Sequence, residues 1–329
     1  MYNRRSALAL FGGALATPAL LRTGYAQGWS PSRAIRLVVA YPAGGPTDAI
    51  ARIVAQDIAP ALGQGVVVEN TAGASGSIGT RGVARAEADG HVITFGNNQT
   101  HGNNKFLLRD PGYDPIDDFT PLAGAGAFEH AFVVKNDLPV RSIPELIALA
   151  KAKPGELNYA STGVGSGSHL STELFMVRTG IKMTHVPYRG AAPLVQDLVA
   201  GRVDVANSTL PSVLAQINAG SMRAIAIASP KRNPNLPNVA TLREQGVSDA
   251  DADSWAGFFA PVRTPAPAVD RLSREILASL AKPAVAEAIT KLGFTMTVRN
   301  PAAFRPYHLQ EMRTWEEIIR VAAIPKQEG

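Results

Sequence analysis

The stretch RLVVAYPAGGPTDAIAR, residues 36–52, decides the fold. Residues 37–41 predict a buried strand, residues 42–45 a loop, and Pro46 the start of a helix. At such a helix start the backbone N–H groups have no intrahelical partner, and the helix dipole adds partial positive charge. A small anion can therefore bind there without a charged side chain.

The same order of strand, glycine turn and helix follows directly along the chain. After a helix near residues 46–61, we expect a strand at 66–70, a glycine turn at 73–76, a helix to about residue 88, and a strand at 92–95. This βαβαβ order predicts a parallel sheet with helices on both faces. Ligands of such sheets bind at the carboxyl ends of the strands, where the polar loops lie.

A second group of strands and helices follows the turn-rich residues 110–118. Extended segments at 119–126 and 131–134 predict a crossing into a second lobe. That lobe repeats the pattern, with strands expected at 158–162, 183–186, 203–206 and 222–229 and helices at 169–179 and 192–200. Residues 255–261 are expected to cross back, followed by helices near 268–280, 283–292 and 301–321 and a strand at 294–298.

The predicted architecture is therefore α/β, with two lobes, two crossing segments and a ligand cleft between the lobes. We expect the first lobe to hold residues 27–126 and 256–329, and the second lobe residues 127–255. The return crossing could begin as early as residue 225.

Residues 1–26 predict a secretory signal peptide. Arg4 and Arg5 precede an apolar run, and small residues at 24–26 predict cleavage after Ala26. The paired arginines leave two export routes open, the twin-arginine route and export of the unfolded chain. We therefore expect a periplasmic protein.

Composition excludes several function classes. Removing residues 1–26 takes away three arginines and no acid, so the formal charge falls from +5 to +2. The remaining chain has no block of like charges, so a nucleic-acid partner is not expected. It has no cysteine, which excludes thiol catalysis and thiolate metal sites. No second apolar run reaches membrane-spanning length, so we expect a soluble mature protein, a monomer by default.

Motifs for catalysis, metals and nucleotides are incomplete. The six histidines lack metal-site spacing, and neither Ser75 nor Ser166 has the GxSxG pattern of a hydrolase nucleophile. The glycine spacings match neither a P-loop nor a dinucleotide fingerprint. We therefore expect no metal, no cofactor and no enzymatic activity. A secreted hydrolase or lyase is the alternative.

Neutral hydrogen-bond donors gather instead in the predicted strand-end loops. Residues 44–45, 73–76, 97–100, 161–168 and 188–190 all fall on one predicted edge, and Asn97 opens the third of these loops. Their backbone, hydroxyl and amide groups suit a carboxylate, which favours binding over catalysis. Tyr41 and Tyr188 are the main aromatic candidates for the cleft and leave a planar acid open.

Three further residues each have two interpretations. Asp48 either complements the helix dipole and steadies the loop or contacts the ligand. Arg189 either pairs with a carboxylate or is a solvated residue at the cleft rim. His169 either caps a helix start or contacts the ligand.

An ordered set of motifs resembles the Bug (TctC-like) family, the periplasmic solute receptors of tripartite tricarboxylate transporters. The set comprises VVAYPAGGPTDAIAR, VVVENTAGASGSIGT, ADGHVITFGNNQTH, YDPIDDFTPLA, LNYASTGVGSGSHLSTELF, HVPYRGAAPLVQDLVAGRVD, RAIAIASPKRNPNLPNVATLREQG and SWAGFFAP. Each motif alone is weak, but together they cover nearly the whole mature chain in the family's order.

The resemblance implies a type II periplasmic binding protein fold that closes around a small carboxylate. It places ligand-binding roles on one set of residues in each lobe: Ala43, Gly44, Gly45 and Asp48 in the first, and Ser161, Thr162, Ser166, His169, Tyr188, Arg189 and Gly190 in the second. The family often has an aromatic residue and an acid where Asn207 and Ser208 stand. We therefore expect a smaller, more polar pocket wall at Asn207.

The resemblance also implies a partner. A receptor of this kind delivers its carboxylate to the permease subunits of an ion-driven transporter. A sensory module that signals to a membrane kinase would need the same closure, so the sequence leaves transport and sensing open.

Overall fold

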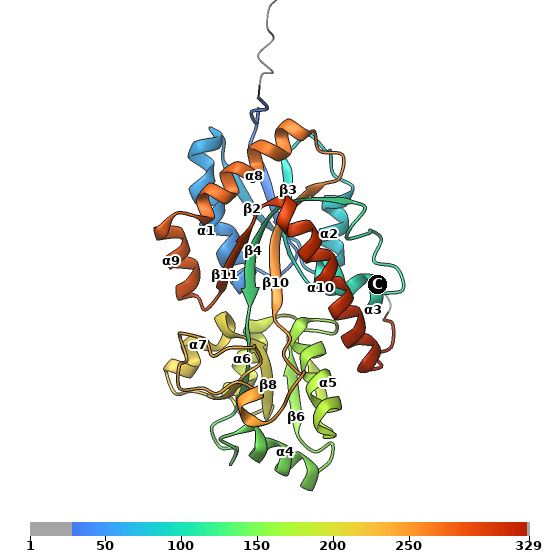
Figure 1. Cartoon of the computed structure of the whole chain (residues 1–329), viewed down its shortest axis with the longest axis vertical. Helices are drawn as coiled ribbons and strands as arrows, with labels where there is room; N and C mark the ends of the chain where they lie inside the picture. Colours follow the sequence, from blue (N-terminus) through green and yellow to red (C-terminus); the bar gives the residue numbers. More distant parts are fainter. Residues whose placement is uncertain (1–27, 328–329) are drawn as a thin grey trace, which may run out of the picture.

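The computed structural model describes residues 28–327, and the predicted signal peptide lies outside them. Figure 1 shows two α/β lobes stacked along the long axis, each built around one sheet. We call the lobe with the six-stranded sheet lobe 1 and the lobe with the five-stranded sheet lobe 2. The predicted α/β, two-lobed fold class is confirmed. The proposed lobe boundaries stay a prediction.

The sheet of lobe 1 has the strand order β11-β4-β10-β3-β1-β2. Its parallel part is the predicted βαβαβ unit, with β1 (Ile35–Val39) between β2 (Val66–Asn70) and β3 (Val92–Asn97). The other three strands are antiparallel to their neighbours: β4 (Phe119–Phe128), β10 (Ser254–Pro261) and β11 (Thr295–Arg299). Apart from the exposed Arg36, the residues of β1 are apolar and buried.

Helices cover both faces of this sheet. They are α1 (Pro46–Leu62), α2 (Ser77–Ala84), α8 (Ala266–Leu280), α9 (Pro283–Lys291) and α10 (Pro301–Val321). Ile50, Val54 and Ile58 of α1 recur at helical spacing and pack onto β1 in the main core of the lobe. α2 ends at Ala84, earlier than the expected residue 88.

The sheet of lobe 2 has the order β7-β6-β8-β5-β9. Its strands are β5 (His130–Val134), β6 (Asn158–Ser161), β7 (Thr184–Pro187), β8 (Val205–Thr209) and β9 (Arg223–Ile227). α4 (Ile143–Ala152) and α5 (Gly167–Thr179) lie on one face, and α6 (Ala191–Val199) and α7 (Leu210–Asn218) on the other. Separate hydrophobic clusters fill the two faces.

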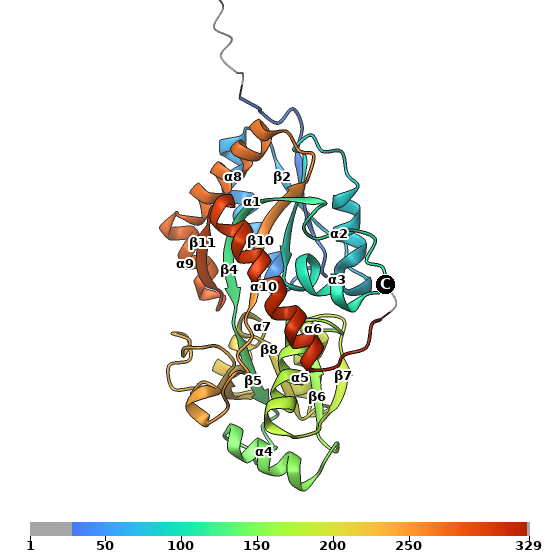
Figure 2. The ribbon, with the colours of Figure 1, turned by 45° about the vertical axis from the view of Figure 1, so that its right-hand side comes forward.

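Two strands carry the chain between the lobes. β4 of lobe 1 leads through Glu129 into β5 of lobe 2, and β10 brings the chain back (Figure 1). Figure 2 shows that α10 runs from lobe 1 down to α5 of lobe 2. These segments place the strand-end loops of both lobes opposite one another.

Three helices were not expected from the sequence: α3 (Asn104–Leu107), α4 and α7. α4 carries a capping signal that could have revealed it, because Ser142 accepts a hydrogen bond from the Glu145 N–H. Pro211 at the start of α7 is a similar signal. Among the described residues, no helix is long and apolar enough to span a membrane.

Candidate functional site

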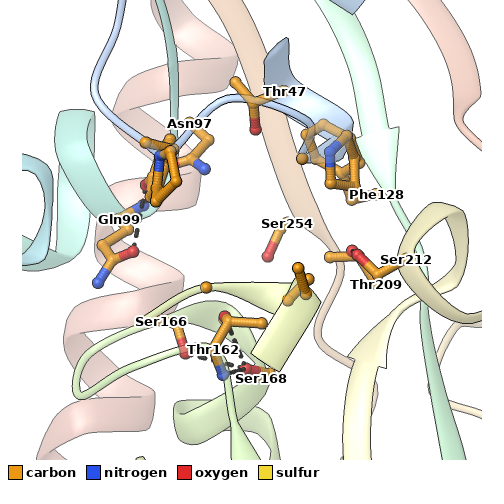
Figure 3. A pocket seen from close by; sticks show the side chains of 18 of the residues that line it. Thr47, Asn97, Gln99, Phe128, Thr162, Ser166, Ser168, Thr209, Ser212 and Ser254 are labelled. Atoms are coloured by element: carbon orange, nitrogen blue, oxygen red, sulfur yellow. Dashed lines mark hydrogen bonds between the residues drawn. The ribbon is translucent and has the colours of Figure 1, made fainter. Parts of the chain in front are cut away.

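A cavity of about 130 Å³ lies between the lobes, at the carboxyl ends of their strands. Lobe 1 and the two crossing strands provide Tyr41, Pro42, Ala43, Gly45, Pro46, Thr47, Asn97, Asn98, Gln99, Phe128 and Ser254. Lobe 2 provides His130, Thr162, Ser166, Gly167, Ser168, Arg189, Gly190, Ala191, Ala192, Pro193, Thr209 and Ser212. Figure 3 shows polar side chains from both lobes around this space, with Ser254 between them.

The wall in lobe 1 is the loop between β1 and α1. Gly44 has a φ of +83°, a backbone conformation that glycine adopts at no steric cost. Gly45 is the N-cap of α1 and gives the helix no side-chain cap. Because Pro46 has no N–H, the unpaired donors of the first turn begin at Thr47, which also lines the cavity.

Asp48 bonds to this loop through Gly44 and does not line the cavity. Its carboxylate accepts hydrogen bonds from the Gly44 N–H at 2.9 Å, from Arg52 at 3.0 Å and from Asn70 at 2.9 Å. Burial raises the pKa of Asp48, but these hydrogen bonds more than offset that effect, so the pKa lies below its usual value. This geometry favours the loop-steadying interpretation.

An Asp48→Asn variant should unfold more easily at pH 7, by about 1–2 kcal/mol, because hydrogen bonds to a charged group are lost. Since the folded-state pKa is depressed, the stabilisation by Asp48 is present above its unfolded pKa and is lost as the pH falls through its folded pKa. Urea unfolding at pH 7 and at pH 3 measures this difference. A gap of the same size at both pH values would contradict the role of the charge.

A chain of hydrogen bonds continues the wall in lobe 1. The Tyr41 hydroxyl is 2.8 Å from Asn97 Oδ1 and 3.1 Å from Gln99 Oε1. Asn97 Oδ1 also accepts from the Gln99 N–H at 3.0 Å. These bonds hold Asn97 and Gln99, which Figure 3 shows on the left side of the cavity.

The loop between β6 and α5 forms the facing wall in lobe 2. Ser166 is the N-cap of α5, and its hydroxyl accepts from the His169 N–H at 3.2 Å. The Ser168 hydroxyl accepts from the Thr162 N–H at 3.0 Å and lies 2.9 Å from the Ser166 hydroxyl. The sequence of small residues thus folds into a compact set of hydroxyl groups at a helix start (Figure 3).

Two more helix N-termini of lobe 2 meet the cavity. α6 begins after Gly190 and α7 after Thr209, and neither N-cap residue makes a side-chain cap. Thr209 pairs instead with Ser212, with 2.8 Å between the hydroxyl oxygens. At the start of α7 the Leu210 N–H donates to the Glu129 carbonyl and Pro211 has no N–H, so the remaining first-turn donor is the Ser212 N–H. The first-turn N–H groups of α6 and the positive ends of both helix dipoles adjoin the same cavity as α1.

The electrostatics of the cavity suit an anion. Arg189 is the one charged side chain among the described residues that line it, and no lining residue is a carboxylate. Burial lowers the pKa of His130 to about 4, while its hydrogen bond to the Ala252 carbonyl opposes this shift. His130 is therefore neutral at pH 7 and donates from Nδ1.

Eight of the fourteen predicted site residues line the cavity: Tyr41, Ala43, Gly45, Asn97, Thr162, Ser166, Arg189 and Gly190. The other six do not: Gly44, Asp48, Ser161, His169, Tyr188 and Asn207. Each of these six lies in or behind a cavity wall. Their side chains or backbone groups bond to the protein itself, which favours supporting roles.

The supporting contacts are specific. Ser161 bonds His185 Nε2 at 2.7 Å, and the His185 ring stacks on His169 with 4.2 Å between the ring centroids. His169 Nδ1 accepts from the Gly165 N–H at 3.2 Å. Burial lowers the pKa of His169 to about 3, with a smaller contribution from His185. His169 is thus a neutral acceptor that holds the glycine loop, which favours a structural role over ligand contact.

Tyr188 and Asn207 also bond within lobe 2. The Tyr188 hydroxyl donates to Asp197 at 2.9 Å, and Asn207 Nδ2 donates to Ser171 at 2.7 Å. Asn207 is fully buried beside α5. The polar wall that we expected at Asn207 is instead provided two residues later, by Thr209.

Several cavity residues were missed as site residues: Phe128, His130, Ser212 and Ser254 in particular. Phe128 and Ser254 belong to the crossing strands β4 and β10, and His130 begins β5; the sequence did not associate these residues with ligand contact. Ser212 follows Thr209 in the first turn of α7, so recognising that helix would have identified both.

Comparison with known proteins connects this chain to a family. Residues 50–324 match the family model described as "Tripartite tricarboxylate transporter family receptor". The chain is 34% identical to protein BugT of Bordetella pertussis over 97% of this chain and 98% of that protein.

Two solved structures with bound carboxylates are similar to this chain. One is a Rhodopseudomonas palustris protein solved with adipate, with 35% identity, a TM-score of 0.87, and coverage of 90% of this chain and 99% of that one. The other is MatC from R. palustris with bound malate, with 32% identity, a TM-score of 0.82, and coverage of 88% and 99%.

Proposed function

Because the chain belongs to the receptor family of tripartite tricarboxylate transporters, we propose that it captures a small dicarboxylate between its lobes and delivers it to the permease of such a transporter. The family consists of periplasmic solute-binding receptors, not of enzymes, so the alternative of a hydrolase or lyase is set aside. We propose the periplasm as the location of this chain as well.

The observation that carries the proposal is the convergence of three helix N-termini without side-chain caps on one cavity. α1 comes from lobe 1, and α6 and α7 come from lobe 2. Each offers at least one first-turn N–H donor, which in α7 is that of Ser212, and a partial positive charge. Arg189 adds a full charge. Such donors bind a carboxylate with little rearrangement.

Donors on opposite walls favour a ligand with two acidic groups. One carboxylate can meet the start of α1 while the other meets α6 and α7. Apolar surfaces of Pro42, Pro46, Phe128 and Pro193 are available for the carbon chain between them. The related proteins solved with adipate and malate have ligands of this class.

A ligand that touches both walls couples binding to lobe closure. In an open arrangement the ligand contacts one wall only, so the closed state binds it more tightly and becomes more populated. A closed receptor then presents one shape to the permease. We propose this coupling as the basis of delivery.

A thermal-shift panel tests the proposal. Adipate, malate and related dicarboxylates should raise the unfolding temperature, because a ligand at a hundred times its Kd stabilises by about 2.7 kcal/mol. For a chain of this size that amounts to several degrees. The neutral control is adipamide, which keeps the shape of adipate and should give no shift. No shift with any dicarboxylate, or an equal shift with adipamide, would refute the proposal.

Delivery needs its own test. Deletion of the gene should abolish uptake of the binding dicarboxylate by cells, and restoring the gene should restore uptake. Unchanged uptake together with confirmed binding would favour the sensory alternative.

A further inference from the structure

Lobe 1 holds the glycine loop of lobe 2 directly. The Val164 carbonyl accepts a hydrogen bond from Ser75 Oγ at 3.2 Å and another from Gln99 Nε2 at 3.2 Å. The next carbonyl, that of Gly165, accepts from Asn103 Nδ2 at 3.1 Å. Three side chains of lobe 1 thus bond two successive carbonyls of lobe 2.

The first donor comes from an unusual backbone. Residues 73–76 all have positive φ, including the non-glycine residues Ala74 (+44°) and Ser75 (+54°). Left-handed backbone at such residues costs free energy and persists where the surroundings enforce it. Asn104 Nδ2 donates to the Ser75 carbonyl at 3.0 Å and helps to hold this turn. The turn was predicted to face the ligand, but it lies outside the cavity lining and contacts the other lobe.

Gln99 connects these contacts to the ligand cavity. Its Nε2 donates to Val164, its Oε1 accepts from the Tyr41 hydroxyl, and the residue itself lines the cavity. The side-chain amide of Gln99 therefore bonds to the cavity wall of lobe 1 through its oxygen and to lobe 2 through its nitrogen.

Apolar packing continues the same interface. Leu170 and Leu174 of α5 in lobe 2 pack with Leu107 of α3 and with Trp315 of α10 in lobe 1. Gly165 has a φ of +78°, and a Cβ there would lie only 2.8 Å from Leu107 Cδ1. The glycine loop can approach lobe 1 this closely because it has no side chain at that position.

We propose that Ser75, Gln99 and Asn103 form a latch on the carbonyls of residues 164 and 165, and that this latch favours the closed arrangement of the lobes without help from ligand. The donors and the acceptors of these bonds all belong to the protein, so the bonds need no ligand atom. The latch acts on the arrangement of the two lobes. Its test therefore does not depend on which ligand the cavity binds.

Distance measurements between spin labels test the latch. The chain has no cysteine, so Val67→Cys and Val199→Cys provide the two attachment sites. Val67 is 51% exposed on the edge strand β2 of lobe 1, and Val199 is 46% exposed at the end of α6 in lobe 2. The full exported chain should show a dominant short distance in the absence of any added carboxylate.

Gln99→Glu is the decisive variant. A carboxylate still accepts from Tyr41 but cannot donate to the Val164 carbonyl, so the latch contact becomes repulsive. We expect the ratio of short to long distances to fall roughly tenfold or more, and Ser75→Ala to reduce it roughly two- to tenfold.

Gln245→Glu is the matched control. Gln245 also donates from Nε2 to a carbonyl, that of Ile225 at 2.8 Å, and accepts an N–H from Ile143, but all three residues lie in lobe 2. This variant should lose stability and keep the short distance. Three results would each overturn the latch. The parent could show only the long distance, Gln99→Glu could show the same distance distribution as the parent, or Gln245→Glu could shift the distribution as much as Gln99→Glu does.

Discussion

A Thr209→Asp variant is expected to bind dicarboxylate at least about a hundredfold more weakly and yet to fold as stably as the parent protein. Thr209 is the N-cap of α7 and lines the cavity, but its hydroxyl pairs with Ser212 and does not cap the helix. Aspartate is a favourable N-cap residue and can accept from the Ser212 N–H. The free energy of unfolding should therefore stay level or rise.

The affinity of the Thr209→Asp variant for dicarboxylate should fall. The new carboxylate would accept the hydrogen bond of the Ser212 N–H, which the ligand would otherwise receive. It would also repel the negative charge of the ligand. Two such charges about 5 Å apart repel by about 3 kcal/mol at an effective dielectric constant of about 20, which corresponds to a factor of about one hundred.

Calorimetric titration with adipate or malate measures the loss, and Thr209→Asn is the uncharged control of the same shape. The control should lose much less affinity. Equal losses in both variants would show that shape rather than charge governs this wall, and unchanged binding in Thr209→Asp would exclude α7 from the site.

Gly126→Ala should lower the free energy of unfolding by about 3 kcal/mol or more, because steric overlap in a packed sheet has no room to relax. Gly126 lies in β4 between β10 and β11, opposite Ala256 and Met296. A Cβ there would overlap the Thr295 carbonyl oxygen and would lie 2.9 Å from Met296 Cα. Both are backbone atoms, so only a shift of β11 could relieve the contact.

Gly82→Ala is the matched control for this effect. Gly82 lies inside α2, and nothing stands within 4 Å of its Cβ position. Alanine there should stabilise the protein by about 0.5–1 kcal/mol, since it favours the helix. Urea unfolding of the two variants compares them. A neutral Gly126→Ala would contradict the close approach of β4 and β11.

The opening stretch shows what the sequence could predict. The apolar run, the glycines and Pro46 are local signals, so α1 begins where expected, and β1 lies two residues before the expected 37–41. The glycine and hydroxyl loops likewise predicted most of the cavity wall. Local patterns suffice when the backbone itself forms the site.

The missed features depend on contacts between distant residues. For Asp48 the sequence left ligand contact and loop support open, and its bond to Asn70, 22 residues further along the chain, favours loop support. For His169 the sequence left a helix cap and a ligand contact open, and its stacking on His185 is a contact that no local pattern identifies. Extended segments were expected at the positions of β4, β10 and β11, but their antiparallel pairing in the sheet of lobe 1 was not, because it joins residues far apart in the chain.

The central claim is that helix N-termini of both lobes hold the two ends of a dicarboxylate. The most direct test is a crystal structure of the protein with the dicarboxylate that the thermal-shift panel selects. We expect one carboxylate within about 2.7–3.1 Å of N–H donors in the first turn of α1, and the other at the starts of α6 and α7, directly or through one ordered water. A ligand bound outside this cavity, or held by side chains alone with no such backbone contact, would contradict the account.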